Sequence, residues 1–146
     1  MGISDDIIKQ IEAALGKGIN PKNLSITARK TANSIKKRTR LGKGVKQDGA
    51  KLNKLDPLTP TYKKQRKKLK LSSDTTPAKS NLTKSGSMLN DIKTKTTSSG
   101  FEIFFGSDKN KEKAEGLGKK RPFFFISSFE LKLIIEDILS RITRGK

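Results

Sequence analysis

The apolar residues of this 146-residue chain gather in its second half, and this distribution limits where a core can form. All seven phenylalanines lie between residues 81 and 142, together with a run of aliphatic residues near the C-terminus. The middle of the chain is so basic that it can pack on little except an anionic partner. We therefore expect the core to be built around residues 81–142.

The clearest helical pattern is the one that ends the chain. Ser127 and Glu130 have the spacing of a capping box, in which each residue satisfies a backbone amide of the other. The apolar positions that follow recur at the period of one helix face. They are Leu131, Ile134, Ile135, Ile138, Leu139 and Ile142.

Two helices are expected before this region. The first begins at Ser4 and ends at Gly16, and the second begins at Asn20-Pro21, an N-cap followed by proline at the first helical position. The second helix runs to about Arg40, with Gly42 as its stop signal. Its expected buried stripe is Leu24, Ala28, Thr31, Ala32, Ile35 and Thr39.

The remaining segments predict short elements. Residues 41–57 show no periodicity, a short helix opens at Thr59-Pro60 and runs to residue 69, and 71–80 is loop. A helix over 85–92 and strands over 93–97 and 101–105 follow, with a turn at 98–100. Residues 106–120 form a charged loop with at most a helical turn at 111–115, and 122–126 form a further strand.

These elements predict an α+β fold in a single domain, 1–146. N-terminal helices precede a small antiparallel β-sheet, and the C-terminal helix packs on the sheet. A basic, mobile loop occupies about 41–80. Apolar residues make up only 32% of the chain, which is low for a globular protein. A core this thin favours packing against copies of the same chain or against an anionic partner.

Positive charge is concentrated in one segment. Residues 29–70 hold sixteen Lys or Arg against Asp48 and Asp56, so 16 − 2 = +14 of the net +19 lies there. Two interpretations are open: contact with phosphate or an acidic protein surface, or a solvated, self-repelling loop. Tyr62 is the only aromatic residue of this segment, so any DNA contact would be to the backbone and independent of sequence.

The composition argues against catalysis. The chain has no cysteine and no histidine, and hence lacks the commonest metal ligands and the commonest general base. Gly116-Leu-Gly118 lacks the spacing of a phosphate-binding loop, and Ser85 beside Lys84 has no oxyanion partner. We predict no enzyme activity and no catalytic, cofactor-binding or metal-binding residues. No apolar run is long enough to span a membrane.

Five segments stand out in order along the chain: Arg38-Thr39, Gly42-Lys-Gly44, Pro57-Leu-Thr-Pro-Thr-Tyr62, Asn81 to Ile92 and Arg121-Pro-Phe-Phe124. Taken together, they resemble the virion-morphogenesis proteins of tailed bacteriophages, a family that includes tail-completion and head–tail neck proteins. The resemblance covers about residues 25–140. The family often carries an aromatic and a His-Gln pair where this chain has residues 111–118, which leaves the strand count there open.

The resemblance implies a structural subunit that forms a ring, expected to be a hexamer, and joins or seals head and tail. Its partners would be portal-side, neck or tail-tube proteins and packaged DNA, and it would assemble in the host cytoplasm and reside in the virion. The alternative is a free basic protein that binds nucleic-acid phosphates non-specifically.

Two sets of residues carry these expectations. The predicted partner or phosphate contacts are Arg38, Arg40, Lys43, Lys46, Lys63, Lys64, Arg66, Lys67 and Lys68. The predicted subunit-packing residues are Phe101, Phe104, Phe105, Phe123 and Phe124.

Overall fold

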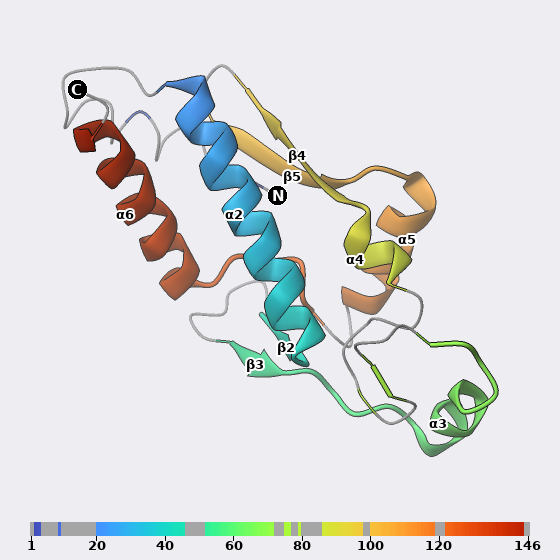
Figure 1. The fold of residues 1–146 in the computed structure, drawn as a ribbon. Coiled ribbons are helices and arrows are strands. Elements are labelled where there is room, and N and C mark those ends of the chain that lie inside the picture. Colours follow the sequence, from blue (N-terminus) through green and yellow to red (C-terminus); the bar gives the residue numbers. More distant parts are fainter. Residues whose placement is uncertain are drawn as a thin grey trace.

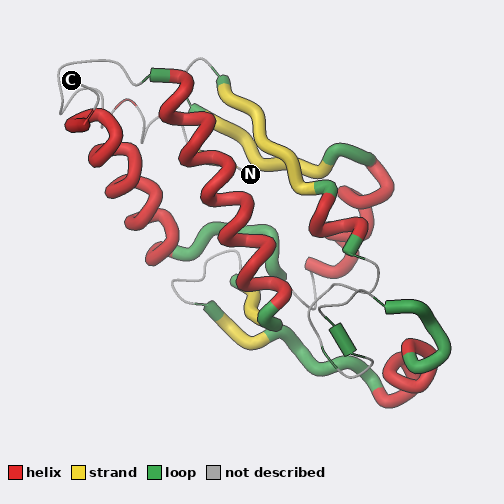
Figure 2. The backbone as a smooth tube through the Cα atoms, viewed as in Figure 1, coloured by secondary structure: helices red, strands yellow, loops and turns green. Residues whose placement is uncertain are grey.

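The chain adopts an α+β fold in which two helices cover one face of a small antiparallel sheet (Figure 1). The structure is a computed structural model and describes residues 2–3, 9, 20–45, 52–71, 75–76, 79, 86–97, 100–118 and 122–144. The predicted helix over 4–16 lies outside the described residues except for Lys9, as do Lys46 and the centre of the 98–100 turn. The tube in Figure 2 shows the helices and strands of the described segments.

Helix α2, Pro21–Arg40, is the central element of the fold. The Asn20 side chain accepts a hydrogen bond from the Lys22 amide at 2.8 Å, which caps the helix as predicted. Its buried face contains the whole predicted stripe, and α2 packs on β4 and β5 on one side and on α6 on the other. Two further buried residues of α2, Thr27 and Arg38, were not predicted.

The main sheet has the strand order β1-β5-β4, with both pairings antiparallel. Its strands are β1 (Gly2–Ile3), β4 (Ile92–Thr96) and β5 (Phe101–Phe105). The register pairs Ile92 with Phe105 and Thr96 with Phe101. Alternation then places Phe101 and Ile103 in the core and Glu102 and Phe104 on the opposite, exposed face.

Helix α6, Ser128–Arg144, runs alongside α2 (Figure 1). The predicted capping box forms: the Ser127 amide donates to Glu130 Oε2 at 2.9 Å, and the Glu130 amide donates to Ser127 Oγ at 3.1 Å. Ile134 and Ile138 of α6 belong to the same buried cluster as Phe101 and Ile103 of the sheet. The prediction that the C-terminal helix packs on the sheet is therefore confirmed, with α2 as its nearest neighbour.

Two predictions for the second half are wrong. Residues 106–120 are not a loop, because Asp108–Gly118 forms helix α5, whose Asn110 amide donates to Ser107 Oγ at the N-terminus. Residues 122–126 are not a strand, because the carbonyl groups of Phe123 and Phe125 accept hydrogen bonds from a side chain of α2. The short helix α4 is confirmed but covers only Ser87–Asn90.

The segment after α2 contains more structure than its lack of periodicity indicated. Lys43–Gly44 (β2) pairs with Asn53–Lys54 (β3) in a short antiparallel ladder. Gly42 has a φ of 78°, a left-handed conformation that ends α2 and that glycine adopts without strain. Helix α3, Pro60–Arg66, follows and is capped by Thr59 as predicted, with a 3.3 Å hydrogen bond from the Tyr62 amide.

The packing of α6 gives a direct test of the core. Ile138 is 1% exposed, so Ile138→Asp would place an unpaired charge among apolar side chains. We expect this variant to lose its cooperative thermal transition, measured by circular dichroism. Leu133→Asp, on the exposed side of the same helix, is the matched control and should stay folded. A folded Ile138→Asp protein would contradict this packing.

Candidate functional site

Arg38 is predicted to contact a partner, but the structure places it inside the protein. Its side chain is 6% exposed and its guanidinium group is held on three sides. Nε donates to Glu130 Oε1 at 2.6 Å, one terminal nitrogen donates to the Phe123 carbonyl at 2.9 Å, and the other donates to the Phe125 carbonyl. Arg38 is therefore a structural residue of the core and is removed from the set of contact residues.

Glu130 serves two purposes in this arrangement. One oxygen of its carboxylate caps α6 through the Ser127 amide, and the other pairs with Arg38. A buried ion pair of this kind is tolerated only when its remaining hydrogen-bonding groups are also satisfied, and the two phenylalanine carbonyls meet that need. The result is a fixed junction between the end of α2, the 122–127 segment and the start of α6.

The β2 strand joins the same junction. The Val45 amide donates to the Pro122 carbonyl at 2.9 Å. A Cβ atom added at Gly44 would lie 2.1 Å from that carbonyl oxygen, so only glycine allows the backbones to approach this closely. The segments containing Arg38, Gly44 and Pro122 thus meet at one place.

Helix α3 lies apart from the main body and forms a basic arm, which we define as residues 57–71 (Figure 1). This arm carries six Lys or Arg and no Asp or Glu. Arg66 is its centre: the side chain is buried, donates to the Lys79 carbonyl at 2.8 Å and to Thr75 Oγ1 at 3.1 Å, and lies 5.8 Å from the Tyr62 ring. Arg66 therefore holds the arm in shape rather than facing a partner.

The other predicted contact residues lie closer to solvent. Lys43, Lys64, Lys67 and Lys68 are exposed, and Lys63 is half-buried. Arg40 is half-buried and donates to Asn90 Oδ1 at 2.6 Å, which ties the end of α2 to α4. The lysines of the arm thus remain available as a contact surface, whereas the arginines of the predicted set are engaged within the chain.

The phenylalanines predicted for subunit packing divide into three groups by their exposure. Phe101 and Phe123 are fully buried and pack within the subunit, so they are removed from that set. Phe105 and Phe124 are half-buried and their ring centroids lie 4.7 Å apart. Phe104 is 37% exposed on the sheet face opposite α2 and remains a candidate for contact with another subunit.

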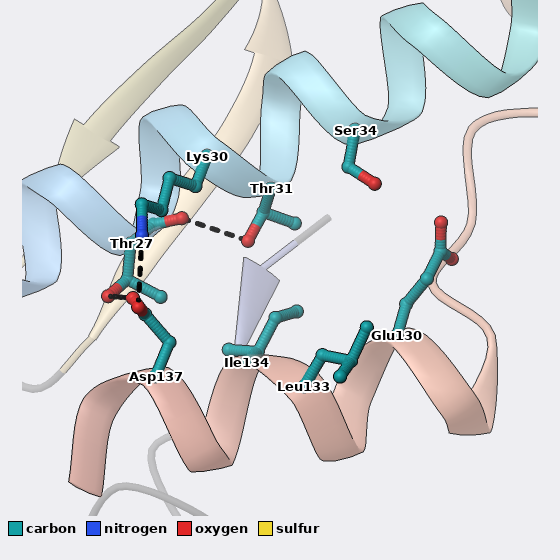
Figure 3. Close-up of a pocket in the computed structure, with 8 residues that line it drawn as sticks. All are labelled: Thr27, Lys30, Thr31, Ser34, Glu130, Leu133, Ile134 and Asp137. Carbon is teal, nitrogen blue, oxygen red and sulfur yellow. Dashed lines mark hydrogen bonds and ion pairs between the residues drawn. The ribbon is translucent and has the colours of Figure 1, made fainter. Parts of the chain in front are cut away.

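A cavity of about 200 Å³ separates α2 from α6 (Figure 3). Its charged groups already have partners within the chain. Asp137 accepts from Thr27 Oγ1 at 2.7 Å, from Lys30 at 3.2 Å and from Arg141 at 2.9 Å, and Glu130 belongs to the Arg38 junction. The cavity is an interhelical cleft closed by ion pairs, and its wall otherwise consists of hydroxyl and aliphatic side chains.

Two carboxylates have shifted pKa values. Hydrogen bonds from the Asn110 side chain and the Ser107 amide hold the pKa of Asp91 below its usual value, and this carboxylate anchors the start of α5. For Asp137, burial by itself would raise the pKa, but the hydrogen bonds from Arg141, Thr27 and Lys30 outweigh burial and lower it. Both carboxylates therefore stabilise the folded chain in their ionised form.

Sequence reasoning missed three cations that the fold brings to a groove. Arg29 and Lys36 of α2 and Lys93 of β4 line a depression between these two elements, and none was singled out among the basic residues. The signal was present, because residues 29, 33, 36 and 40 follow one line of the helix beside the buried stripe. The sequence does not give the position of the sheet, so it could not show that this line of residues borders β4.

No protein-family model, curated protein or solved structure matches this chain. In the part of the chain that the structure describes, no group of three or more metal-binding side chains occurs, and no helix is long and apolar enough to cross a membrane.

The Arg38 junction predicts a large effect of a single substitution. Arg38→Ala would leave Glu130 buried without its counter-charge, which we expect to cost about 3–5 kcal/mol in the free energy of unfolding. Lys37→Ala, on the neighbouring exposed position, should change it by no more than about 0.5 kcal/mol. Urea denaturation measures both values. A decrease of under about 1 kcal/mol for Arg38→Ala would show that the junction is not required for the fold.

The pKa shifts predict the direction of acid destabilisation. The pKa of Asp137 is lower in the folded than in the unfolded chain. Its contribution to stability is therefore complete above the unfolded-state pKa, about 3.9, and is lost as the pH falls from there through the lower folded-state pKa. We expect the thermal unfolding temperature of the wild type to decrease as the pH is lowered below about 4, and the decrease to be smaller for Asp137→Asn. Glu115→Gln, which likewise replaces a carboxylate with its amide but at an exposed position, is the control. Equal pH profiles for the wild type and Asp137→Asn would contradict the assignment.

Proposed function

We propose that this chain is a structural subunit of a tailed-bacteriophage virion, a tail-completion or neck protein whose copies form a ring that joins or seals head and tail. The proposal rests first on the five segments whose order resembles that family. Its role would be geometric and non-enzymatic.

The observation that carries the proposal is the way these segments come together. The Arg38, Gly44 and Pro122 segments meet at one junction, and Asn90, from the fourth segment, accepts a hydrogen bond from Arg40. The remaining segment, Pro57 to Tyr62, opens the basic arm. Four of the five motifs, with Arg38 and Phe123 85 residues apart, thus form one framework, as expected if the resemblance reflects a shared fold rather than chance composition.

The surfaces outside this framework suit an assembling subunit. Phe104 lies exposed on the open sheet face, and Phe129 is 63% exposed and Leu133 48% exposed on α6. Apolar side chains in these positions are available to neighbouring copies. The basic arm, projecting from the body, would dock on an acidic face of an adjoining ring, where opposite charges favour rapid and oriented association.

The proposal is tested by the assembly state and by the position of the chain in particles. We expect electron microscopy of the purified protein at rising concentration to show rings, and labelled protein to lie between head and tail in virions. The competing function, a free nucleic-acid-binding protein, predicts monomers at every concentration and strongly salt-dependent binding to any duplex. Monomers at every concentration, with no label on particles, would overturn the proposal, whereas duplex binding alone would not.

The arm makes a specific prediction within this function. Reversing the charges of Lys64, Lys67 and Lys68 to Glu should reduce incorporation into particles, because the arm would repel an acidic docking face. The fold should be unaffected, since all three side chains are exposed. The readout is the amount of variant protein recovered in virions assembled without the wild-type chain.

The matched control for the arm changes the net charge equally at a different place. It replaces the exposed lysines of α5, Lys109, Lys111 and Lys113, with Glu. If the control triple variant loses incorporation as strongly as the arm variant, total charge rather than the arm governs docking.

A further inference from the structure

A groove of about 430 Å³ lies on the side of α2 opposite α6, between this helix and β4. Its floor is apolar and its rim carries polar and basic side chains. The residues that form it are Arg29, Ala32, Asn33 and Lys36 of α2, with Ile92, Lys93 and Thr94 of β4.

The two cations of the groove differ from the other basic residues of α2. On the α6 side, Lys30 pairs with Asp137. On the groove side, no carboxylate lines the depression, and among the described residues none forms an ion pair with Arg29 or Lys36. These two cations are seven positions apart in the sequence, which places them about 10 Å apart along the helix axis. Positive charge on this side of the helix is therefore not neutralised within the described part of the chain.

The lysines of β4, including Lys93 in the groove wall, do not account for this charge. A Cβ built at Gly106 would meet both the Lys93 ammonium, at 2.7 Å, and Asp91 Oδ1, at 2.6 Å. The Lys93 charge thus lies beside a carboxylate, and it contributes to the lowered pKa of Asp91. Lys95 stands opposite Glu102 in the strand register. The unneutralised charge of the groove is consequently that of α2.

Two effects disfavour the charged form of the Lys36 amine. Burial lowers the pKa of Lys36, and repulsion from Arg40 lowers it further. An anion placed in the groove would offset both, because it replaces the missing hydration and lies near two positive side chains.

We propose that the α2–β4 groove binds the phosphate backbone of duplex nucleic acid without sequence preference, with Arg29 and Lys36 as the contacting cations. Guanidinium, ammonium, amide and hydroxyl groups all donate hydrogen bonds, and phosphate oxygens only accept them. The groove has no aromatic lining on which an unpaired base could stack, which favours a duplex over a single strand.

The dimensions also favour a nucleic-acid backbone over an acidic protein. A stable protein partner needs about 800 Å² of complementary surface on each side, much more than a narrow groove supplies. A phosphodiester strand is thin and carries a charge at every nucleotide, so a few cations in a groove suffice for contact. This inference goes beyond the proposed function, because the groove would bind phosphate whether or not the chain assembles into a ring.

The experiment is fluorescence anisotropy with a labelled 20-base-pair duplex of arbitrary sequence, titrated with the full chain at several salt concentrations. We expect Arg29→Gln/Lys36→Gln to reduce the slope of log K against log salt by about two, one for each phosphate that the variant no longer neutralises. Lys109→Gln/Lys113→Gln, which removes the same charge from the exposed surface of α5, should reduce it by less than half as much. Thermal unfolding verifies that both double variants remain folded.

A second measurement uses only the wild-type chain. Bound duplex should protect Lys36 several-fold from an amine-reactive reagent, as measured by mass spectrometry, whereas Lys113 should react equally with and without duplex. Three results would each overturn the proposal: no duplex binding by the wild type, equal salt slopes for the two double variants, or equal protection of Lys36 and Lys113. Because neither measurement depends on ring formation, failure of the ring proposal would be seen separately.

Discussion

The interaction on which the rest of this structure depends is the enclosure of one arginine side chain. Arg38 extends from the last turns of α2 and binds the carboxylate that caps α6 and two carbonyl groups of the preceding segment. Burying a charge in this way is costly unless every donor is matched. The matching fixes how α2, α6 and the connecting chain lie, in a protein whose apolar content is small. The Arg38 junction thus fixes the relative positions of these elements, a role that a larger apolar core would otherwise have.

Local signals in the sequence predicted the elements whose formation depends on neighbours along the chain. Asn20 and Thr59 cap their helices, Ser127 and Glu130 form the capping box, and Gly42 ends α2. The pattern of residues 101–105 predicted β5, but it did not predict that Phe101 and Ile103 are buried within the subunit. These features follow from backbone hydrogen bonding and side-chain period alone, and they were sufficient for the α+β class.

The candidate site was predicted less well because charge counts carry no information on burial. Arg38 and Arg66 look like the lysines around them in the sequence, yet both are enclosed, since a planar guanidinium can satisfy several acceptors at once. Their partners lie up to ninety-two residues away, beyond any local pattern. The prediction of a strand over 122–126 was wrong for the same reason, because two of its carbonyl groups accept hydrogen bonds from a distant side chain. Arg29 and Lys36 became distinctive only once β4 lay beside them.

The separation of Arg38 from its acceptors also shapes the order in which the chain can fold. A ribosome delivers α2 long before residues 123–130, and β1 likewise pairs with residues made about a hundred positions later. The guanidinium of Arg38 has only water to bind until residues 123–130 have been made, and β1 has no partner strand until β5 has been made. Contacts between such distant segments are slow to form. The contacts of Arg38 can therefore be completed only after α6 has begun to form.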